Sequence, residues 1–564
     1  MARAAYVDGY RPFDYKDFSG GLNLRDKSDA VGDKEAIDLL NVDFTERGAI
    51  RQRDGYADFT PSDLGDRVNS LSPFYKADGT RQLIAGCGTV LQAISNGGDP
   101  LTSLVEPNPG PWVFARFGDP DHEYLYCANG LDPVSRWNGS SWADGSVLAT
   151  VDAQGGKPMP RAGAITVTAA SPGNTSGTNA SNRLVATGFG TQTAAGPGGT
   201  PTNPSRVYFS NPGQPEIWET DGYDGTAADN YRDARGQNYI DLTPGDGEQI
   251  MAAVTWRELV FIFKETKFFV VWGEGQAADG TPTFQYREVV NSIGLASKLA
   301  VSVGRDGVYF INRRGVYRTT GQDPVLISDI VSPMWTQDPD VYFQSHPINL
   351  ARLDLPRLLW NMERVYLAVP TGEAAANDRV LVYDTVHNWW SLYDLPASAL
   401  CAFRADVRPE VTFGYSTGPM RVGRHVLGRR TDREDQRITS RWRSGWGDYG
   451  SSQQIVLRES KVWGSGAVIV SFSVDFNELM RADRDTVLGL LSTWPMDGDG
   501  TWSDWLFLNA NRWPTTGQIS DANVRYATRG TVFSTQFSNS PQSESWSVHR
   551  IARHMREIRQ PSVR

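Results

Sequence analysis

Residues 307–321, GVYFINRRGVYRTTG, show the pattern that decides the fold. Two segments rich in Val, Tyr and Phe flank a short turn at residues 313–315. The pattern returns in residues 124–142, where YLYCANG leads to VSRWNGSSW, and in residues 379–393, RVLVYDTVHNWWSLY. Aromatic and β-branched segments joined by Gly, Asn and Asp turns are typical of β-hairpins. Hairpins repeated along one chain favour a β-propeller, a fold often used for binding or as a scaffold.

Further hairpin segments lie at residues 81–94, 206–213, 259–272 and 364–369. Their spacing is irregular, so the pattern differs from a WD or kelch array and indicates five to seven blades. We therefore predict a mainly β protein, with an irregular β-propeller plus a β-rich platform domain formed by the N-terminal arm and the C-terminal region. The predicted boundaries are 1–60 for the arm, 61–435 for the propeller and 436–564 for the C-terminal platform or nozzle domain.

The predicted arm is extended and rich in turns. Residues 33–40 predict one short helix, with Asp33 as its cap and Ala36, Ile37 and Leu40 on one face, and residues 48–56 predict a strand. Such a segment buries too little apolar surface to fold alone. It must pack on the C-terminal domain or on a neighbouring subunit.

Beyond residue 436, residues 455–457, 467–474 and 530–538 predict strands. Residues 478–491 predict a helix, and residues 548–558 fit either a helix or a final strand. Two polar, low-complexity segments, 169–182 and 190–205, predict surface loops inserted in the propeller, near 169–205.

The 564 residues carry a net charge of −10, which excludes nucleic-acid binding of the usual basic kind. Residues 540–564 hold five Arg and two Glu, which predicts either a solvated basic end or a contact with an acidic partner. The three cysteines have no metal-site spacing and predict reduced core residues. No targeting segment is visible, and we predict no membrane insertion.

The histidines and acidic clusters of the sequence fit plain structural roles better than catalytic or metal-binding ones. The six histidines lack metal-binding spacing, and the DGDGT stretch at 497–501 lacks the glutamate of a calcium loop. The acidic clusters at residues 35–38 and 432–435 are interpreted as surface charge. We therefore predict no enzyme activity and name no catalytic, cofactor-binding or metal-binding residues.

Several segments together resemble one protein family, the tail nozzle or hub proteins of short-tailed bacteriophages, also called tubular tail or DNA-stabilisation proteins. The resemblance extends over nearly the whole chain, although the 169–182 segment has no counterpart. It is carried by FSGGLN at 18–23, residues 33–40, NVD at 41–43, GAIRQRDGY at 48–56, NRLVA at 182–186, PSRVYFS at 204–210, PEIW at 215–218, VYDTVHNWWS at 382–391 and RGTVFS at 529–534.

The resemblance implies a structural virion protein of the phage tail, assembled in the host cytoplasm. Its copies would form a homo-oligomeric ring, a hexamer, below the portal and the portal-adaptor protein, with a tail fibre or tail tip/needle protein as a further partner. The ring would retain packaged DNA, and genomic DNA would pass through its lumen during ejection without sequence-specific binding. Both termini would form the platform, and the propellers would project outward.

Charge is consistent with such a conduit, because lysine and arginine that neutralise phosphates hold a duplex, whereas acidic walls keep it mobile. Six chains at −10 each would carry about −60. Two other classes stay open: a glycan-binding or glycan-hydrolysing propeller that acts in receptor recognition, and a host-derived propeller scaffold.

Overall fold

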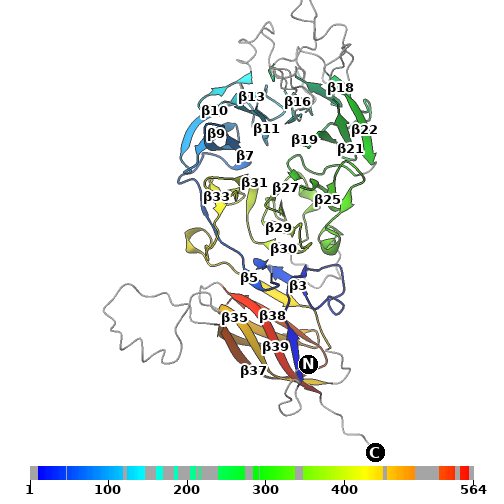
Figure 1. The fold of residues 1–564 in the computed structure, drawn as a ribbon, viewed down its shortest axis with the longest axis vertical. Coiled ribbons are helices and arrows are strands. Elements are labelled where there is room, and N and C mark those ends of the chain that lie inside the picture. The colour runs from blue at the N-terminus through cyan, green and yellow to red at the C-terminus, as the bar shows by residue number, and fades with distance from the viewer. Residues whose placement is uncertain are drawn as a thin grey trace, which may run out of the picture.

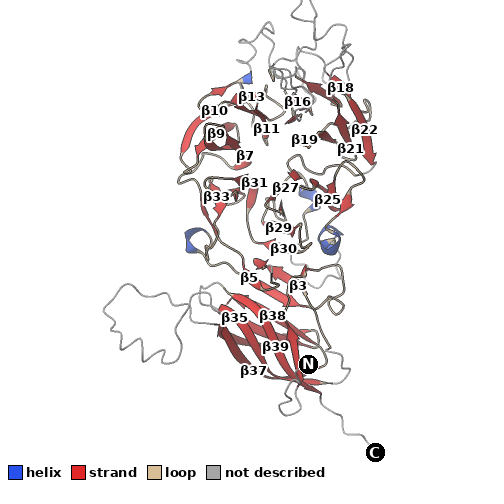
Figure 2. Ribbon diagram, in the orientation of Figure 1, coloured by secondary structure: helices blue, strands red, loops and turns tan. Residues whose placement is uncertain are grey.

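The computed structural model describes residues 11–45, 47–118, 123–145, 161–168, 183–188, 204–210, 215–216, 239–273, 284–290, 293–336, 347–448, 454–488, 520–539 and 546–557. These residues form a ring of small sheets and, beside it, one larger folded sheet (Figure 1). Nearly all regular structure is β-strand (Figure 2), as predicted.

The ring is a β-propeller with seven four-stranded antiparallel blades in the described residues, the upper end of the predicted range. The first strand of each blade lies innermost, against the first strands of the neighbouring blades. The inner strands of blades 1 to 7, numbered in chain order, are β7 (Val68–Tyr75), β11 (Val113–Gly118), β15 (Ala164–Val167), β19 (Ala252–Trp256), β23 (Val301–Gly304), β27 (Arg357–Asn361) and β31 (Ala397–Phe403).

Two further layers of strands follow in each blade. The second layer comprises β8 (Arg81–Cys87), β12 (Glu123–Ala128), β16 (Leu184–Thr187), β20 (Leu259–Phe263), β24 (Gly307–Asn312), β28 (Arg364–Val369) and β32 (Glu410–Tyr415). The third layer comprises β9 (Val90–Ser95), β13 (Ser135–Trp137), β17 (Arg206–Phe209), β21 (Phe268–Trp272), β25 (Gly315–Thr319), β29 (Arg379–Asp384) and β33 (Val422–His425).

The outermost strands complete the blades. They are β10 (Pro100–Val105), β14 (Trp142–Ala143), β18 (Tyr239–Asp241), β22 (Gln285–Val290), β26 (Val325–Leu326), β30 (Trp390–Tyr393) and β6 (Tyr56–Asp58). The hairpin at 307–319 is confirmed as β24 and β25, paired from Val308↔Thr319 to Asn312↔Gly315. All six residues of β24 are buried. β24 is a middle strand of its blade, and the two neighbouring blades cover both faces of that sheet.

The ring is closed by a strand from the N-terminal side of the chain. β6 supplies the outer strand of the seventh blade, where Tyr56 pairs with His425 of β33. The Tyr56 ring also meets Phe413 edge-on, with centroids 5.3 Å apart. Residues 56–58 were assigned to the arm from the sequence, but their pairing makes them part of the propeller.

The larger sheet is the platform, and it draws its eleven strands from both ends of the chain. They are β1 (Arg11–Tyr15), β2 (Gly21–Leu22), β3 (Glu35–Leu40), β4 (Val42–Phe44), β5 (Ile50–Gln52), β34 (Arg441–Ser444), β35 (Ile455–Val474), β36 (Asn477–Leu488), β37 (Ser520–Gly530), β38 (Phe533–Asn539) and β39 (Ser547–Glu557). The 20-residue β35 pairs with β37 and β39 along its first half and with β36 and β38 along its second.

Two predicted helices are strands, and those predictions were wrong. Residues 35–40 form β3, and five of its six residues are buried. β3 pairs with β34, so a partner about 400 residues away in sequence outweighs the local helical pattern. Most of residues 478–491 lie in β36, which pairs with β35. Of the two alternatives for residues 548–558, the strand is confirmed as β39.

Short helices connect some strands. They are α2 (Pro333–Thr336), η3 (Asp329–Val331), η4 (Leu350–Arg352) and η5 (Arg433–Asp435). No helix in the described part of the chain is long and apolar enough to span a lipid bilayer. The three cysteines are free and buried, as predicted. Residues 169–182, most of residues 190–205 and the DGDGT stretch lie outside the described residues.

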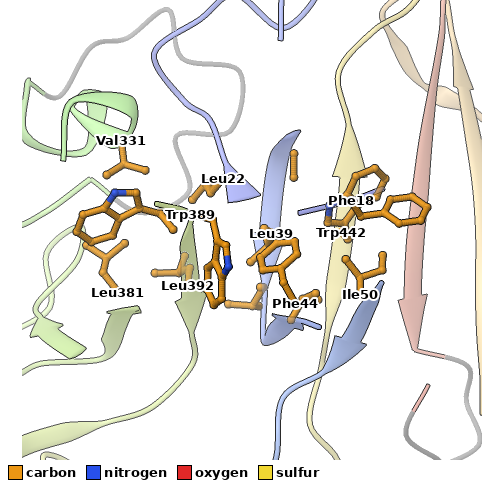
Figure 3. Packing of buried hydrophobic residues seen from close by; sticks show 14 of the residues in the cluster. Phe18, Leu22, Leu39, Phe44, Ile50, Val331, Leu381, Trp389, Leu392 and Trp442 are labelled. Atoms are coloured by element: carbon orange, nitrogen blue, oxygen red, sulfur yellow. The ribbon is translucent and has the colours of Figure 1, made fainter. Parts of the chain in front are cut away.

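One hydrophobic core joins the platform to the propeller. Figure 3 shows Leu39 and Phe44, on the platform strands that the arm supplies, between Trp389 of blade 6 and Trp442 of β34. The arm strands are therefore the part of the platform that packs against the propeller.

Candidate functional site

Arg53 lies at the centre of the contact between the arm and the propeller, just after β5. Its side chain is buried, and its guanidinium makes a two-pronged ion pair with Asp432, with Nη1–Oδ1 and Nη2–Oδ2 distances of 2.9 and 2.8 Å. Its Nε donates to the side-chain oxygen of Asn41 at 2.8 Å. Two-pronged, charge-assisted contacts fix orientation as well as distance. Arg53 therefore sets how the arm meets the end of the propeller sequence.

Asp43 of β4 binds the arm to blade 6. Its carboxylate accepts hydrogen bonds from Arg364 of β28 at 3.0 Å and from the Tyr393 hydroxyl of β30 at 2.6 Å. Burial by itself raises the pKa of Asp43, but the charge of Arg364 and the Tyr393 hydrogen bond outweigh burial and hold the pKa below its usual range. Asp43 is therefore a buried carboxylate that stays ionised.

Two of the acids interpreted as surface charge are buried, so that interpretation was wrong for them. Asp432 pairs with Arg53, and Asp38 accepts a hydrogen bond from Arg441. The cation and the acid are 379 residues apart in the first pair and 403 residues apart in the second. Local sequence carries no sign of such a partner.

Two glycines allow the backbones to meet closely at the arm. Gly21 has a φ of +75°, and a Cβ there would lie 2.7 Å from the Cβ of Trp389. A Cβ on Gly55 would lie 1.9 Å from the backbone oxygen of Thr431, far inside contact distance. Gly21 requires glycine because of its positive φ and its closeness to Trp389, and Gly55 requires glycine because a Cβ would overlap the Thr431 oxygen.

The basic C-terminal segment is partly structural rather than a solvated end. Arg550 of β39 forms an ion pair with Asp14 of β1. Arg553 is buried, and its guanidinium lies 4.4 Å from the centroid of the Tyr15 ring. These contacts fasten β1 to β39, so the first and last described strands are held together.

A second candidate site is a cavity of about 240 Å³ at the centre of the propeller. It is lined by residues from or next to all seven inner strands, and its walls include Trp112, Ile165 and Leu358. Its titratable side chains, among the described lining residues, are Lys298 and Arg357. Both are cations, and neither was singled out from the sequence.

Burial affects both cations. It lowers the pKa of Lys298, and it lowers the pKa of Arg357 to about 10, an effect that Asp354 opposes only in part. The Nη1 atom of Arg357 donates to the backbone oxygens of Leu355 and Pro356 at 2.8 and 3.0 Å. The cavity is therefore a partly open space whose titratable lining residues, among those described, are both basic.

The described histidines do not converge on one another. His425 is buried, its Nε2 lies 2.9 Å from the backbone oxygen of Asp54, and burial lowers its pKa. His387 contacts Asp384, and His549 contacts Ser547. Within the described ranges, no three His, Cys, Asp or Glu residues gather as a metal site.

No family model matches the sequence, and neither does any curated protein. Similar solved structures include a streptogramin B lyase, with 11% identity and a TM-score of 0.36, covering 65% of this chain and 96% of that chain. BBS1N in complex with ARL6DN has 10% identity and a TM-score of 0.39, covering 67% and 98%. The Pan2 WD40 domain of Neurospora crassa has 8% identity and a TM-score of 0.32, covering 68% and 97%. At these values the similarity carries no functional inference, and the propeller assignment rests on strand pairing.

Proposed function

We propose that this protein is a structural virion component, a subunit of the tail nozzle or hub ring of a short-tailed bacteriophage. Six copies would surround a lumen through which the genome leaves. The portal-adaptor protein would bind on one side, and a tail fibre or tail tip/needle protein would be a further partner. The observation that carries the proposal is the platform, which both ends of the chain build together.

That platform is the arrangement implied by the family resemblance of the sequence. β1 runs antiparallel to β39 from Arg11↔Met555 to Tyr15↔Ile551. β3 pairs with β34, and β5 pairs with β39. A platform of this kind forms only when strands from both ends of the chain pair with each other. Ring assembly would therefore depend on both ends being folded.

The contact between arm and propeller also supports a mechanical role. The apolar core and the ion pairs of Arg53 and Asp43 connect the platform with blade 6 and with the end of the propeller sequence. Buried ion pairs are poor sources of net stability but can fix one arrangement among several. A subunit that must hold a channel open would benefit from such fixed geometry.

Electron microscopy of the purified full-length protein tests the proposal. We expect six-fold rings with an axial hole wide enough for a B-DNA duplex. Particles that stay monomeric, or closed assemblies without an axial hole, would contradict it. In a reconstruction of the ring, we expect the side chains facing the hole to be net acidic; a wall dense in Arg and Lys would contradict the proposed sliding of DNA.

Ligand binding by the propeller is the second candidate function, because one observation favours it: the central cavity. Its described lining residues include two cations and no carboxylate. Glycoside hydrolysis uses a pair of carboxylates. Of the two forms of the glycan hypothesis, the cavity therefore favours binding, and a glycan array of the full-length protein would test it, with retention of acidic glycans expected.

A further inference from the structure

Two basic side chains line the central cavity of the propeller, and its described lining residues include no carboxylate to neutralise them. It is enclosed by the inner strands of the seven blades, and apolar side chains such as Val113, Ile165 and Leu358 form much of its wall. An apolar wall weakens screening by water, so a charge in this space acts more strongly than one on the surface.

Lys298 supplies the first charge. It precedes β23 of blade 5, and its amino group lies 3.4 Å from the position that a Cβ on Gly163 would take. Gly163 directly precedes β15 of blade 3, so the lysine reaches across the cavity past the blade between them. The described lining residues of the cavity include no carboxylate that could neutralise this charge.

Arg357 of β27 supplies the second charge, and its side chain lines the same space while only 9% of the residue is exposed. One edge of its guanidinium is held by the backbone oxygens of Leu355 and Pro356. Its Nε is buried without a hydrogen-bond partner in the described part of the chain. A buried donor left unpaired destabilises the folded protein, and more so when the donor is charged.

Polar groups of blade 1 complete the lining. Asn69, Ser70 and Ser72 all face this space, and Asn69 Oδ1 is buried without a hydrogen-bond donor among the described residues. The lining therefore offers two cations for a negative group and an acceptor for a hydroxyl. The buried guanidinium of Arg357 favours a ligand because desolvating an unpaired charged donor is costly, and the half-buried Lys298 adds its charge from the wall of the same space.

We propose that the central cavity of the propeller binds a small oxyanion, a phosphate or a carboxylate, with Lys298 as its main charge partner and Arg357 as the second. The volume of about 240 Å³ suits a free phosphate or a single acidic sugar rather than a polymer. The proposal concerns the propeller of one chain and is independent of ring assembly.

Isothermal titration calorimetry with the full-length protein tests this site, with inorganic phosphate as one probe and glucuronate as the other. We expect saturable binding of at least one probe. Binding of phosphate alone identifies a free phosphate or phosphoryl group as the ligand, and binding of glucuronate identifies an acidic sugar. Absence of binding by both probes would overturn the proposal.

Three variants locate the binding. Lys298→Met removes the charge but keeps the length of the side chain, and we expect affinity to fall about tenfold or more, since a hydrogen bond to a charged group contributes about 1.5–3 kcal/mol. Lys298→Arg restores the charge and should restore most of the affinity. Lys76→Met removes a propeller lysine outside the cavity, one that contacts Asp78, and should bind like the original protein.

Circular dichroism of each variant confirms that the fold is retained. Equal affinity in Lys298→Met and the unaltered chain would overturn the proposal, because the binding would then lie elsewhere. A fall in affinity in Lys76→Met as large as that in Lys298→Met would overturn it as well, since it would indicate a response to net charge alone.

Discussion

The propeller and the platform are both built from β-strands, but they are assembled in opposite ways. Among the described strands of the propeller, each pairs with the strand before or after it in the chain, except that β6 comes from a distance. In the platform, β1 pairs with β39 and β3 with β34, so segments more than 400 residues apart lie side by side. Local hairpins are thus enough to make the blades, whereas the platform exists only when the two ends of the chain meet.

The buried ion pairs at the arm contact also join distant parts of the chain, whereas the buried Lys264 of the propeller pairs with an aspartate 18 residues away. Asp432 and Asp43 are both buried where the arm meets the propeller, and each faces an arginine from a distant part of the sequence. Solvent-exposed pairs such as Arg305 with Glu363 occur on the blades. Because buried pairs are strongly coupled and exposed ones are not, substitutions should distinguish the buried pairs of the arm contact from the exposed pairs on the blades.

The largest effect is expected at Arg53. Arg53→Met leaves Asp432 buried without its cation, and the free energy of unfolding should fall by about 3–5 kcal/mol. Urea denaturation followed by tryptophan fluorescence measures the change.

Arg305→Met is the matched control, because it breaks an exposed ion pair on blade 5. Its effect should stay below about 1 kcal/mol. Equal losses in the two variants would show that the arm contact has no special role.

The next largest effect is expected at Gly55, where a new Cβ would meet the Thr431 backbone oxygen at 1.9 Å. Gly55→Ala should lower the free energy of unfolding by about 3 kcal/mol, since overpacking against backbone cannot be relieved by a rotamer change. Gly118→Ala is the control, as a Cβ there meets nothing within 4 Å. A thermal unfolding midpoint for Gly55→Ala that equals that of the control would contradict the steric explanation.

These contrasts also explain what the sequence could and could not predict. The hairpin at 307–319 was predictable because both strands and their turn lie in one short stretch. Residues 33–40 were predicted as a helix because Ala36, Ile37 and Leu40 fit a helical face, while β34, the partner of the strand at 35–40, lies far away in sequence. Local pattern and long-range pairing disagree there, and pairing prevails.

The candidate sites were harder still to predict. Lys298 and Arg357 share a cavity only because seven inner strands arrange themselves around one axis. Neither residue lies in a motif, and their separation in sequence carries no geometric information. Arg53 lies in a segment predicted as a strand, and nothing in that segment indicates a buried ion pair. Its partner Asp432 was interpreted as part of a charged surface cluster.

The free energy of unfolding should depend on pH through Glu106, which is buried between blades 1 and 2 and accepts a hydrogen bond from Ser135. Burial raises the pKa of Glu106 to about 7, with Asp144 and Asp132 adding to the shift and Ser135 opposing it. From about pH 4.3 to 7 the unfolded chain loses this proton while the folded chain keeps it. Glu106 therefore makes the free energy of unfolding fall as pH rises, by up to about 1.4 kcal/mol per pH unit.

Glu106→Gln should remove this slope, and the difference between the two proteins across that window measures it. Glu265→Gln, at an exposed glutamate of the propeller, should leave the slope unchanged. A slope that persists in Glu106→Gln would assign it to other groups.

The smallest effect is expected on the outer edge of a blade. Leu101 of β10 is about half exposed, so Leu101→Thr should change the free energy of unfolding by no more than about 0.5 kcal/mol. Urea denaturation measures it alongside the other variants. A loss of several kcal/mol would mean that this edge is covered in solution.

Amide hydrogen exchange on the full-length protein tests most directly whether the arm joins propeller and platform into one body. Amides of residues 36–44 and 50–58 should exchange only when the whole molecule unfolds, with protection equal to that of the long strand β35. Rapid exchange of these amides, while the propeller strands stay protected, would show that the arm opens independently and would contradict the coupling.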